Sequence, residues 1–193
     1  MTTETSSAQR LPTTRGGSLC PVCHDAATAR IDLGEYRLFE CTSCRSWSSD
    51  AAAVGASSSF EPDGYFENSA ADHDKWERLM EQLDGLGKPL ASVLDIGCGT
   101  GNFLEWIHER EPGLEIEGIE LDPGRSQLAR ERNPGARIHS GDALENVAQQ
   151  ERRFDLITLW DVFEHVPEPA RLLDQLAQRV TPGGCVYIQT IHE

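Results

Sequence analysis

The sequence predicts an α/β fold built on a doubly wound parallel sheet. An apolar run over 93–96 is followed by glycines at 97, 99 and 101, and a helical pattern begins at Asn102. Further apolar or alternating segments recur toward the C-terminus, separated from one another by helical spacing or by turn residues. Strands that alternate with helices in this way form a parallel sheet with helices on both faces. We expect the strand order 3-2-1-4-5.

The strands follow from local patterns of apolar residues. The segment 154–160 is nearly continuous in apolar residues, as expected for a strand that is buried on both faces. Residues 182–184 are Pro-Gly-Gly, which predicts a turn before the last strand. The full set of expected strands is 93–96, 114–119, 136–139, 154–160 and 185–189.

The helices follow from apolar residues at helical spacing. One helix is expected to begin near Asp72, and Pro123 is expected to begin another that runs to about Arg132. In the latter helix we expect Leu128 and Ala129 to face inward. The residues expected on the buried faces of the other helices are Trp76, Leu79, Met80 and Leu83 in the first helix, and Leu172, Leu173, Leu176 and Val180 in the last.

The charge of the chain is strongly acidic. It holds 32 acidic and 17 basic residues, for a formal net charge of -15. Nucleic-acid binding depends largely on Lys and Arg that neutralise phosphates, so we expect no nucleic-acid partner. No run approaches the roughly 18 apolar residues of a membrane span, and the N-terminus lacks the apolar core of a signal peptide. We therefore expect a cytoplasmic protein.

Four of the six cysteines form two closely spaced pairs. Seventeen residues separate the pair Cys20 and Cys23 from the pair Cys41 and Cys44, and the segments 29–33 and 36–40 between them resemble two short strands. Two such pairs place four thiolates where one tetrahedral Zn²⁺ can accept them all. A redox role for the pairs is the alternative, and the lack of a surrounding βαβ pattern disfavours it. We predict a zinc ribbon whose metal stabilises a module with little core of its own.

The composition divides the chain into four parts. Residues 1–18 are polar and are expected to form a disordered tail, and 19–47 form the ribbon. Residues 48–60 are rich in Ser and Ala, which is typical of a flexible linker. The α/β domain is expected over 61–193.

The expected site lies at the carboxyl edge of the sheet, where ligands bind in such folds. The glycine turn, Glu120, Asp142 and the segment 160–165 all fall on that edge. Glu120 follows the turn by about 20 residues, the separation at which an acid can accept hydrogen bonds from ribose hydroxyls. Asn102 stands where a dinucleotide motif has its third glycine, and the Lys of a phosphate-binding Walker loop is absent. An acid at 95 suits a ligand with a cationic end.

The segment Leu94–Gly101 resembles the first motif of class I S-adenosylmethionine (SAM)-dependent methyltransferases. The similarity continues in order through Glu120, 141–143, 155–157, 164–166 and 182–184, and covers roughly residues 61–193. The resemblance implies a Rossmann-like sheet, a methyltransferase activity and SAM as the cofactor. Chains that join a zinc ribbon to such a domain occur among methyltransferases of secondary metabolism, including those of sugars, and among ribosomal RNA methyltransferases.

The resemblance also implies roles for individual residues. Asp95 and the 97–101 loop would lie against the methionine part, Glu120 against the ribose, and Asp142 with Ala143 against the adenine. The residues expected to bind the cofactor are Asp95, Gly97, Cys98, Gly99, Gly101, Glu120, Leu121, Asp142, Ala143 and Trp160.

The segment after the fourth strand holds the candidate catalytic groups. Asp161 and His165 are candidates for a general base, and together with Glu164 they also offer a divalent metal a set of ligands. His165 as a structural residue at a helix start is the alternative. The acidic surface favours a small-molecule acceptor, such as a secondary metabolite or a sugar. A SAM-binding subunit without turnover and an RNA methyltransferase are the other hypotheses.

Class I domains have two more strands after the fifth, and the printed sequence stops before them. A partial sequence, a reduced domain, or a fifth strand paired with another chain would each account for this pattern. The last case predicts a homo- or hetero-oligomer that forms through the open edge of the fifth strand.

Overall fold

The computed structural model describes residues 9–10, 18–32, 37–49, 70–85, 87 and 89–190. The chain forms two compact units, one made by the N-terminal region with residues 165–170 and the other by 62–164 with 171–193. Most of the predicted tail and of the predicted linker lies outside the described residues. No helix within the described ranges is both long enough and apolar enough to cross a membrane.

The α/β unit contains a five-stranded sheet in the order β10-β9-β6-β7-β8. Every neighbouring pair is parallel. Numbered along the domain, this is the predicted order 3-2-1-4-5, so the expected fold class is confirmed. The strands are β6 (Ser92–Ile96), β7 (Glu115–Glu120), β8 (Arg137–Ser140), β9 (Phe154–Trp160) and β10 (Val180–Gln189).

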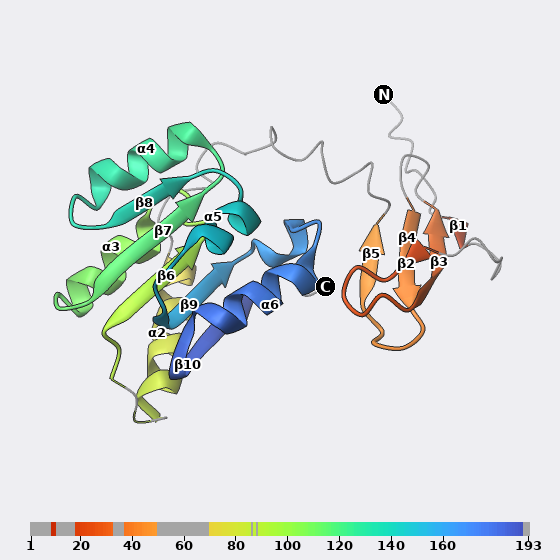
Figure 1. The fold of residues 1–193 in the computed structure, drawn as a ribbon, viewed down its shortest axis with the longest axis horizontal. Helices are drawn as coiled ribbons and strands as arrows, with labels where there is room; N and C mark the ends of the chain where they lie inside the picture. Colours follow the sequence, from red (N-terminus) through yellow and green to blue (C-terminus); the bar gives the residue numbers. More distant parts are fainter. Residues whose placement is uncertain are drawn as a thin grey trace. The chain divides into compact units, whose positions relative to one another are not determined.

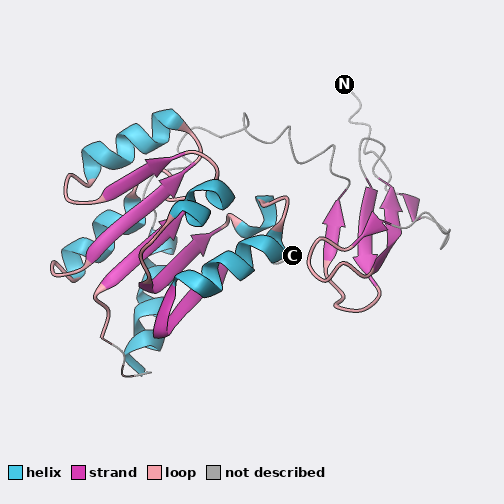
Figure 2. Cartoon of the chain, viewed as in Figure 1, coloured by secondary structure: helices cyan, strands magenta, loops and turns pink. Residues whose placement is uncertain are grey.

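Helices cover both faces of this sheet. Figure 1 shows α5 and α6 in front of the sheet and α2 behind it, and Figure 2 shows the same layers by secondary structure. β6 and β9 lie in the interior of the sheet and are almost completely buried, which explains why their sequences are mainly apolar. The helices are α2 (Ala70–Gly85), α3 (Asn102–Arg110), α4 (Pro123–Arg132), α5 (Ala143–Gln149) and α6 (Pro169–Arg179), with a short 3₁₀ turn η2 (Phe163–His165).

The helix faces agree with the predicted ones except at a few positions. All four residues of the α2 stripe are buried, with Leu79 at 2% exposure, and Leu172 and Leu176 of α6 are buried as well. Leu173 is only partly buried, and Val180 was expected in this helix but is the first residue of β10, because α6 ends at Arg179. Leu128 of α4 was expected to face inward, and this prediction is wrong, because its side chain is 51% exposed. The narrow face that α4 turns to the sheet consists of Ser126 and Ala129, one helical turn apart.

The start of the last strand also differs from the prediction. Residues 182–184 were expected to form a turn, and they lie within β10, where the pairing with β9 shifts register between Val180 and Cys185. A Cβ atom on Gly184 would lie 2.8 Å from the backbone oxygen of Asp155. Glycine is required here because β10 passes so close to β9. Among the described residues β10 pairs with β9 alone, and an oligomer through its other edge stays a prediction.

The N-terminal unit is a small antiparallel sheet. Its strands run in the order β1-β3-β4-β5, with β2 on β3. The predicted pair of strands is present as β3 and β4, although residues 33–36 lie outside the described ranges. Among the described residues, the buried apolar cluster of this sheet contains Ala27, Ala29 and Phe39. The strands are β1 (Gln9–Arg10), β2 (Ser18–Leu19), β3 (Ala26–Asp32), β4 (Arg37–Cys41) and β5 (Trp47–Ser49), so 9–10 and 48–49 add strands to the expected tail and linker.

A buried carboxylate joins three segments of the α/β unit. Glu117 of β7 is 2% exposed, and its Oε1 atom lies 2.7 Å from Arg137 Nη2 and 2.6 Å from Arg152 Nη1. Its Oε2 atom lies 3.1 Å from His139 Nε2. Arg137 and His139 belong to β8, and Arg152 precedes β9, so one side chain ties together segments that are far apart in sequence. A buried charge is tolerated here because both of its oxygens have partners.

Replacing Glu117 by Gln is expected to lower the free energy of unfolding by roughly 1.5–3 kcal/mol, because hydrogen bonds between charged groups are lost inside the protein. Urea denaturation followed by tryptophan fluorescence measures this change. The matched control is Glu115→Gln, whose side chain is 63% exposed and contacts the same two arginines. The control is expected to change stability by less than about 1 kcal/mol. An equal loss in both variants would contradict the importance of the buried carboxylate.

Candidate functional site

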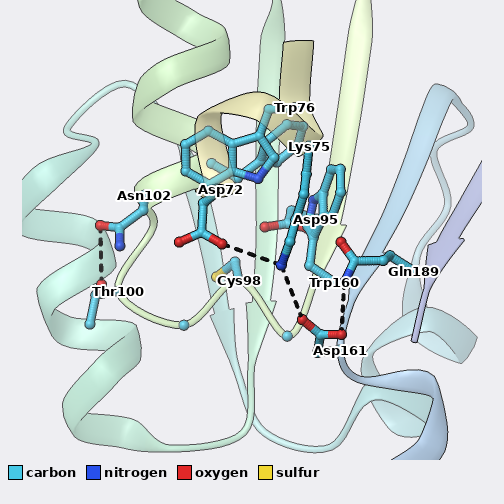
Figure 3. Close-up of a pocket in the computed structure, with 13 residues that line it drawn as sticks. Asp72, Lys75, Trp76, Asp95, Cys98, Thr100, Asn102, Trp160, Asp161 and Gln189 are labelled. Carbon is cyan, nitrogen blue, oxygen red and sulfur yellow. Dashed lines mark hydrogen bonds and ion pairs between the residues drawn. The ribbon is translucent and has the colours of Figure 1, made fainter. Parts of the chain in front are cut away.

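A pocket of about 250 Å³ opens at the carboxyl edge of the sheet, beside the end of β6. It combines the loop after β6 with residues from α2, α3 and the ends of β9 and β10, and Figure 3 shows their side chains converging on one space. The lining residues are Asp72, Lys75, Trp76, Asp95, Gly97, Cys98, Gly99, Thr100, Asn102, Phe103, Trp160, Asp161 and Gln189.

The glycine loop has a backbone conformation that other residues rarely adopt. Gly97, Gly99 and Gly101 all have positive φ angles, of 71°, 55° and 82°. A Cβ atom on Gly97 would also lie 2.3 Å from Val162 Cγ2, so this position has no room for a side chain. The loop is anchored to β7, because the Gly97 and Cys98 amides both donate to the carbonyl of Ile119, at 2.7 and 3.0 Å. The backbone of the loop is therefore held in place at the wall of the pocket.

Asp95 places a carboxylate at the base of this pocket. The residue is 2% exposed, and its Oδ1 atom accepts a hydrogen bond of 2.7 Å from Thr158 Oγ1 of β9. Burial raises the pKa of Asp95 to about 7, the hydrogen bond from Thr158 opposes this change, and the charge of Glu120 adds to it. A cationic ligand beside Asp95 would favour the ionised form, so the site is suited to a positive group.

Glu120 supports the loop from the neighbouring strand end. Its Oε2 atom accepts a hydrogen bond of 2.9 Å from the Gly99 amide, and its Oε1 atom accepts one of 2.9 Å from the Asp122 amide. Arg125 Nη1 lies 3.7 Å from the same carboxylate. Glu120 is 4% exposed and does not line the pocket. It fixes the loop beside the place where a ligand would continue toward β7 and β8.

The other predicted cofactor residues lie along these neighbouring strand ends. Asp142 caps α5 by accepting a hydrogen bond of 3.1 Å from the Glu145 amide, and Ala143 is the first residue of that helix. Leu121 is 65% exposed and follows β7 directly. The Gly141 amide donates to the Glu120 carbonyl at 2.9 Å, which keeps the ends of β7 and β8 together.

The structure thus divides the predicted site residues into two groups. Asp95, the first two loop glycines with Cys98, Trp160 and Asp161 line the pocket. Gly101 and the residues at the ends of β7 and β8 do not line it, and neither does His165, which ends the η2 turn. Of the two candidate bases, only Asp161 lies in the pocket wall.

Sequence reasoning missed the contribution of α2 and of β10. The Lys75 ammonium lies 3.4 Å from Asp72 Oδ1 and 3.9 Å from Asp161 Oδ2, as the dashed lines in Figure 3 show. Gln189 lies at the end of β10 and donates to Asp161 Oδ1 at 2.9 Å. The i, i+3 spacing of Asp72 and Lys75 was visible in the sequence, but only the packing of α2 brings these side chains to the glycine loop.

Aromatic rings form one wall of the pocket and continue behind it. The ring of Phe103 lies 5.7 Å from that of Trp76 and 5.2 Å from that of Trp160, measured between centroids. Tyr187 of β10 lies 4.9 Å from Trp160 on its other side. These contacts join α2, α3, β9 and β10, so this wall of the pocket is also part of the core of the domain.

The four cysteines of the N-terminal unit form a second candidate site. Their sulfur atoms all lie within 4.8 Å of one another. Cys20 Sγ lies 3.6 Å from Cys44 Sγ, and Cys23 Sγ lies 3.5 Å from Cys41 Sγ. The edges of a tetrahedron with Zn–S bonds of about 2.3 Å measure about 3.8 Å, so the spacing fits a single zinc ion.

Hydrogen bonds to the sulfurs also suit thiolates. The Val22 amide donates to Cys20 Sγ, and the Ser43 amide donates to Cys41 Sγ, each at 3.4 Å. Burial tends to raise the pKa of Cys20, but hydrogen bonds from Ser46 and from the backbone lower it to about 6. The pKa of Cys23 moves the other way, to about 12, because a backbone hydrogen bond at Asp25 is outweighed by its contacts with Cys41 and the other cysteines. The donor set and its geometry are therefore compatible with a metal-binding cysteine cluster.

Comparison with known proteins identifies relatives over the α/β unit. A family model described as a methyltransferase domain matches residues 65–193. The ubiquinone biosynthesis O-methyltransferase of Aeromonas salmonicida is 31% identical over 169 residues, which cover 85% of this chain and 64% of that protein. The trans-aconitate 2-methyltransferase of Methylobacterium nodulans is 36% identical over 117 residues, which cover 58% of this chain and 45% of that protein.

A solved structure agrees with these relatives. The SAM-bound amino pentose methyltransferase from Micromonospora echinaspora, which is involved in calicheamicin biosynthesis, superposes with a TM-score of 0.56 at 29% sequence identity. The superposition covers 62% of this chain and 51% of that one. The chain spans about half the length of most of the curated relatives it matches.

Replacing Asp95 by Asn is expected to raise the melting temperature by a few degrees at pH 8 and by less at pH 5. The pKa of Asp95 is raised from 3.8 to about 7, so between these pH values the folded protein binds more protons than the unfolded chain. Stability therefore falls as the pH rises through this window, and an uncharged side chain removes the loss. Asparagine still offers Thr158 an acceptor.

Differential scanning fluorimetry at both pH values measures the effect. Asp174→Asn, a substitution of the same kind on the exposed face of α6, is the control and is expected to change little at either pH. Equal shifts at pH 5 and pH 8 in the Asp95 variant would show that its carboxyl group is not responsible.

Proposed function

The chain belongs to the methyltransferase-domain family of SAM-dependent enzymes, and from this premise we propose that it transfers a methyl group from SAM to a small-molecule acceptor. The observation that carries the proposal is the buried Asp95 carboxylate beside a loop of three glycines with positive φ angles, of which Gly97 has no room for a side chain. SAM offers an ammonium and a sulfonium group at one end, and a carboxylate in this position suits a cation.

The charges of the pocket match the amino-acid end of SAM. Asp95 would face the ammonium group, which favours the ionised form of its carboxylate. Lys75 is the one cation among the residues that line the described pocket, so it would face the carboxylate of the same ligand. In the structure its ammonium lies between the carboxylates of Asp72 and Asp161, within reach of the pocket.

The adenosine end of SAM would extend along the neighbouring strand ends. Glu120 follows β7 and lies against the glycine loop, where its carboxylate would accept hydrogen bonds from ribose hydroxyls. Asp142, Ala143 and Leu121 follow β8 and β7 and would lie near the adenine. This arrangement explains why the predicted residues divide into a pocket group and a strand-end group, since the ligand spans both.

The reaction is an in-line displacement at the methyl carbon of the sulfonium, with a neutral thioether as the leaving group. Most of the acceleration can then come from holding the acceptor atom in line with the methyl group, for which the aromatic wall of Trp76, Phe103 and Trp160 provides a rigid surface. An acceptor that must lose a proton needs a base, and Asp161 is the candidate because it lines the pocket.

The relatives and the charge of the chain support a small-molecule acceptor. The curated relatives named above methylate small molecules, and the solved one is an amino pentose methyltransferase. The excess of acidic residues, 32 against 17 basic ones, disfavours a phosphate-rich acceptor such as RNA. We therefore propose a secondary metabolite or a sugar as the acceptor.

Isothermal titration calorimetry tests the cofactor assignment. The protein is expected to bind SAM and S-adenosylhomocysteine (SAH). Asp95→Asn is expected to lower the affinity for SAM by at least about tenfold, because a charged partner of the ligand is lost. The control is again Asp174→Asn, which is expected to bind both ligands as the unchanged protein does. If neither ligand binds at millimolar concentration, the proposed function is wrong.

We further propose that Cys20, Cys23, Cys41 and Cys44 bind one structural Zn²⁺. The support is the mutual distance of the sulfurs, within 4.8 Å, and the small size of the apolar cluster that the described residues of this unit form, which contains Ala27, Ala29 and Phe39. The ion would stabilise the unit by joining the segment before β3 to the end of β4 and the turn that follows it.

Metal analysis of the purified protein is expected to find about one zinc per chain. Cys41→Ser is expected to lose the metal, because Cys41 is one of the buried sulfurs, while the control Cys185→Ser keeps it. Zinc content that is the same in the two variants, or absent from a protein whose N-terminal unit is folded, would contradict the proposal.

A further inference from the structure

Gln189 makes two separate hydrogen bonds to Asp161 across the ends of β9 and β10. Its backbone carbonyl accepts a bond of 2.9 Å from the Asp161 amide, and its side-chain Nε2 donates to Asp161 Oδ1 at 2.9 Å. The register explains the contact, because Gln189 pairs with Trp160, the residue immediately before Asp161. Figure 3 shows the two side chains together at the edge of the pocket.

Asp161 has a backbone conformation that needs such support. Its φ angle is 53°, in the left-handed region that residues with a side chain rarely adopt. A residue in this region costs free energy and persists only where its surroundings hold it. The bonds from Gln189 hold both the backbone and the side chain of Asp161, so they define where its carboxylate lies.

The orientation of the Gln189 amide is set by this contact. Its Oε1 atom is buried and has no hydrogen-bond partner among the described residues. Exchanging the amide oxygen and nitrogen would give Oε1 a neighbour, but that neighbour is the Asp161 carboxylate, and two acceptors repel each other. The observed orientation therefore leaves the amide oxygen without a partner among the described residues and lets the amide nitrogen donate to Asp161.

Fixing one carboxylate oxygen leaves the other directed toward Lys75. Asp161 Oδ1 is bound by Gln189, and Oδ2 lies 3.9 Å from the Lys75 ammonium. Lys75 is in turn 3.4 Å from Asp72 Oδ1. A chain of contacts thus runs from β10 through the end of β9 to α2, and it ends on the cation that lines the pocket beside Asp95.

We infer that Gln189 is a positioning residue, which holds Asp161 and through it Lys75 in the arrangement that receives the amino-acid end of the ligand. This inference rests on the proposed function, since Lys75 is assigned there to the ligand carboxylate. Gln189 itself need not touch the ligand. Substituting Gln189 weakens the binding of the amino-acid half of SAH. The binding of the adenosine half is unaffected, because Glu120 and Asp142 lie outside this chain of contacts.

Two ligands and two substitutions test the inference by calorimetry. SAH carries the amino-acid end, whereas 5′-methylthioadenosine keeps the adenosine and the sulfur but lacks the amino and carboxyl groups. Gln189→Glu is isosteric and turns the donor into a group that repels Asp161, while Gln189→Leu removes the donor at similar size. We expect Gln189→Glu to lower the affinity for SAH by about tenfold and Gln189→Leu to lower it by less. The affinity for methylthioadenosine is expected to be unchanged in both variants.

The order of the two variants separates positioning from packing. If Gln189 only fills space, the isosteric Glu variant binds SAH at least as well as the Leu variant, and the inference is wrong. Gln178→Glu, which adds the same charge on the exposed side of α6, is the matched control and is expected to bind both ligands normally. Should Gln189→Glu fail to fold, the Leu variant alone still tests the inference, through its selective loss of SAH affinity.

A double-mutant cycle with Asp161→Asn shows whether Gln189 acts through Asp161. We expect the single Asp161→Asn variant to weaken SAH selectively, and Gln189→Glu to add no further loss in that background. Additive losses, or equal losses for SAH and methylthioadenosine, would overturn the role of Gln189. If the unchanged protein binds neither ligand, the proposed function fails instead, so the two failures are distinguishable.

Discussion

The burial of the Asp95 carboxylate at the end of β6 is the constraint on which the site depends. β6 is the middle strand of the sheet, so helices and neighbouring strands exclude water from this position, and the residue is 2% exposed. An isolated buried charge is unfavourable, and the structure compensates only in part, through Thr158 of β9. A cationic ligand beside Asp95 would therefore stabilise the ionised form of its carboxyl group.

The loop that follows Asp95 depends on the same crowding. Gly97 meets the side chain of Val162, and the loop amides are bound by the Ile119 carbonyl and by Glu120. Each of these partners lies at or just after the carboxyl end of a parallel strand, where neighbouring strands bring their ends to one edge. The sheet therefore determines both the shape of the loop and the line along which a ligand with an amino-acid end and an adenosine end would lie.

The two units are stabilised in different ways. The α/β unit has a large apolar core, and it can also accommodate a buried carboxylate, Glu117, that is paired with two arginines. In the N-terminal unit the described residues form a buried apolar cluster of three, and the four cysteine sulfurs lie within 4.8 Å of one another. In the proposed enzyme a metal would replace the core in the small unit, while packing around β6 and β9 builds the site in the large one.

The sequence by itself determined the glycine loop, Asp95 and the paired cysteines, because each depends on local pattern or on spacing, and the strand order followed from the fold class that these patterns indicate. It placed Leu128 in the core, since spacing alone does not show how narrow a face α4 turns to the sheet. Lys75 and Gln189 could not be predicted as site residues, because α2 and β10 reach the glycine loop only through long-range packing. Which residues carry the motif is thus local information, whereas which side chains complete the pocket is decided by the tertiary structure.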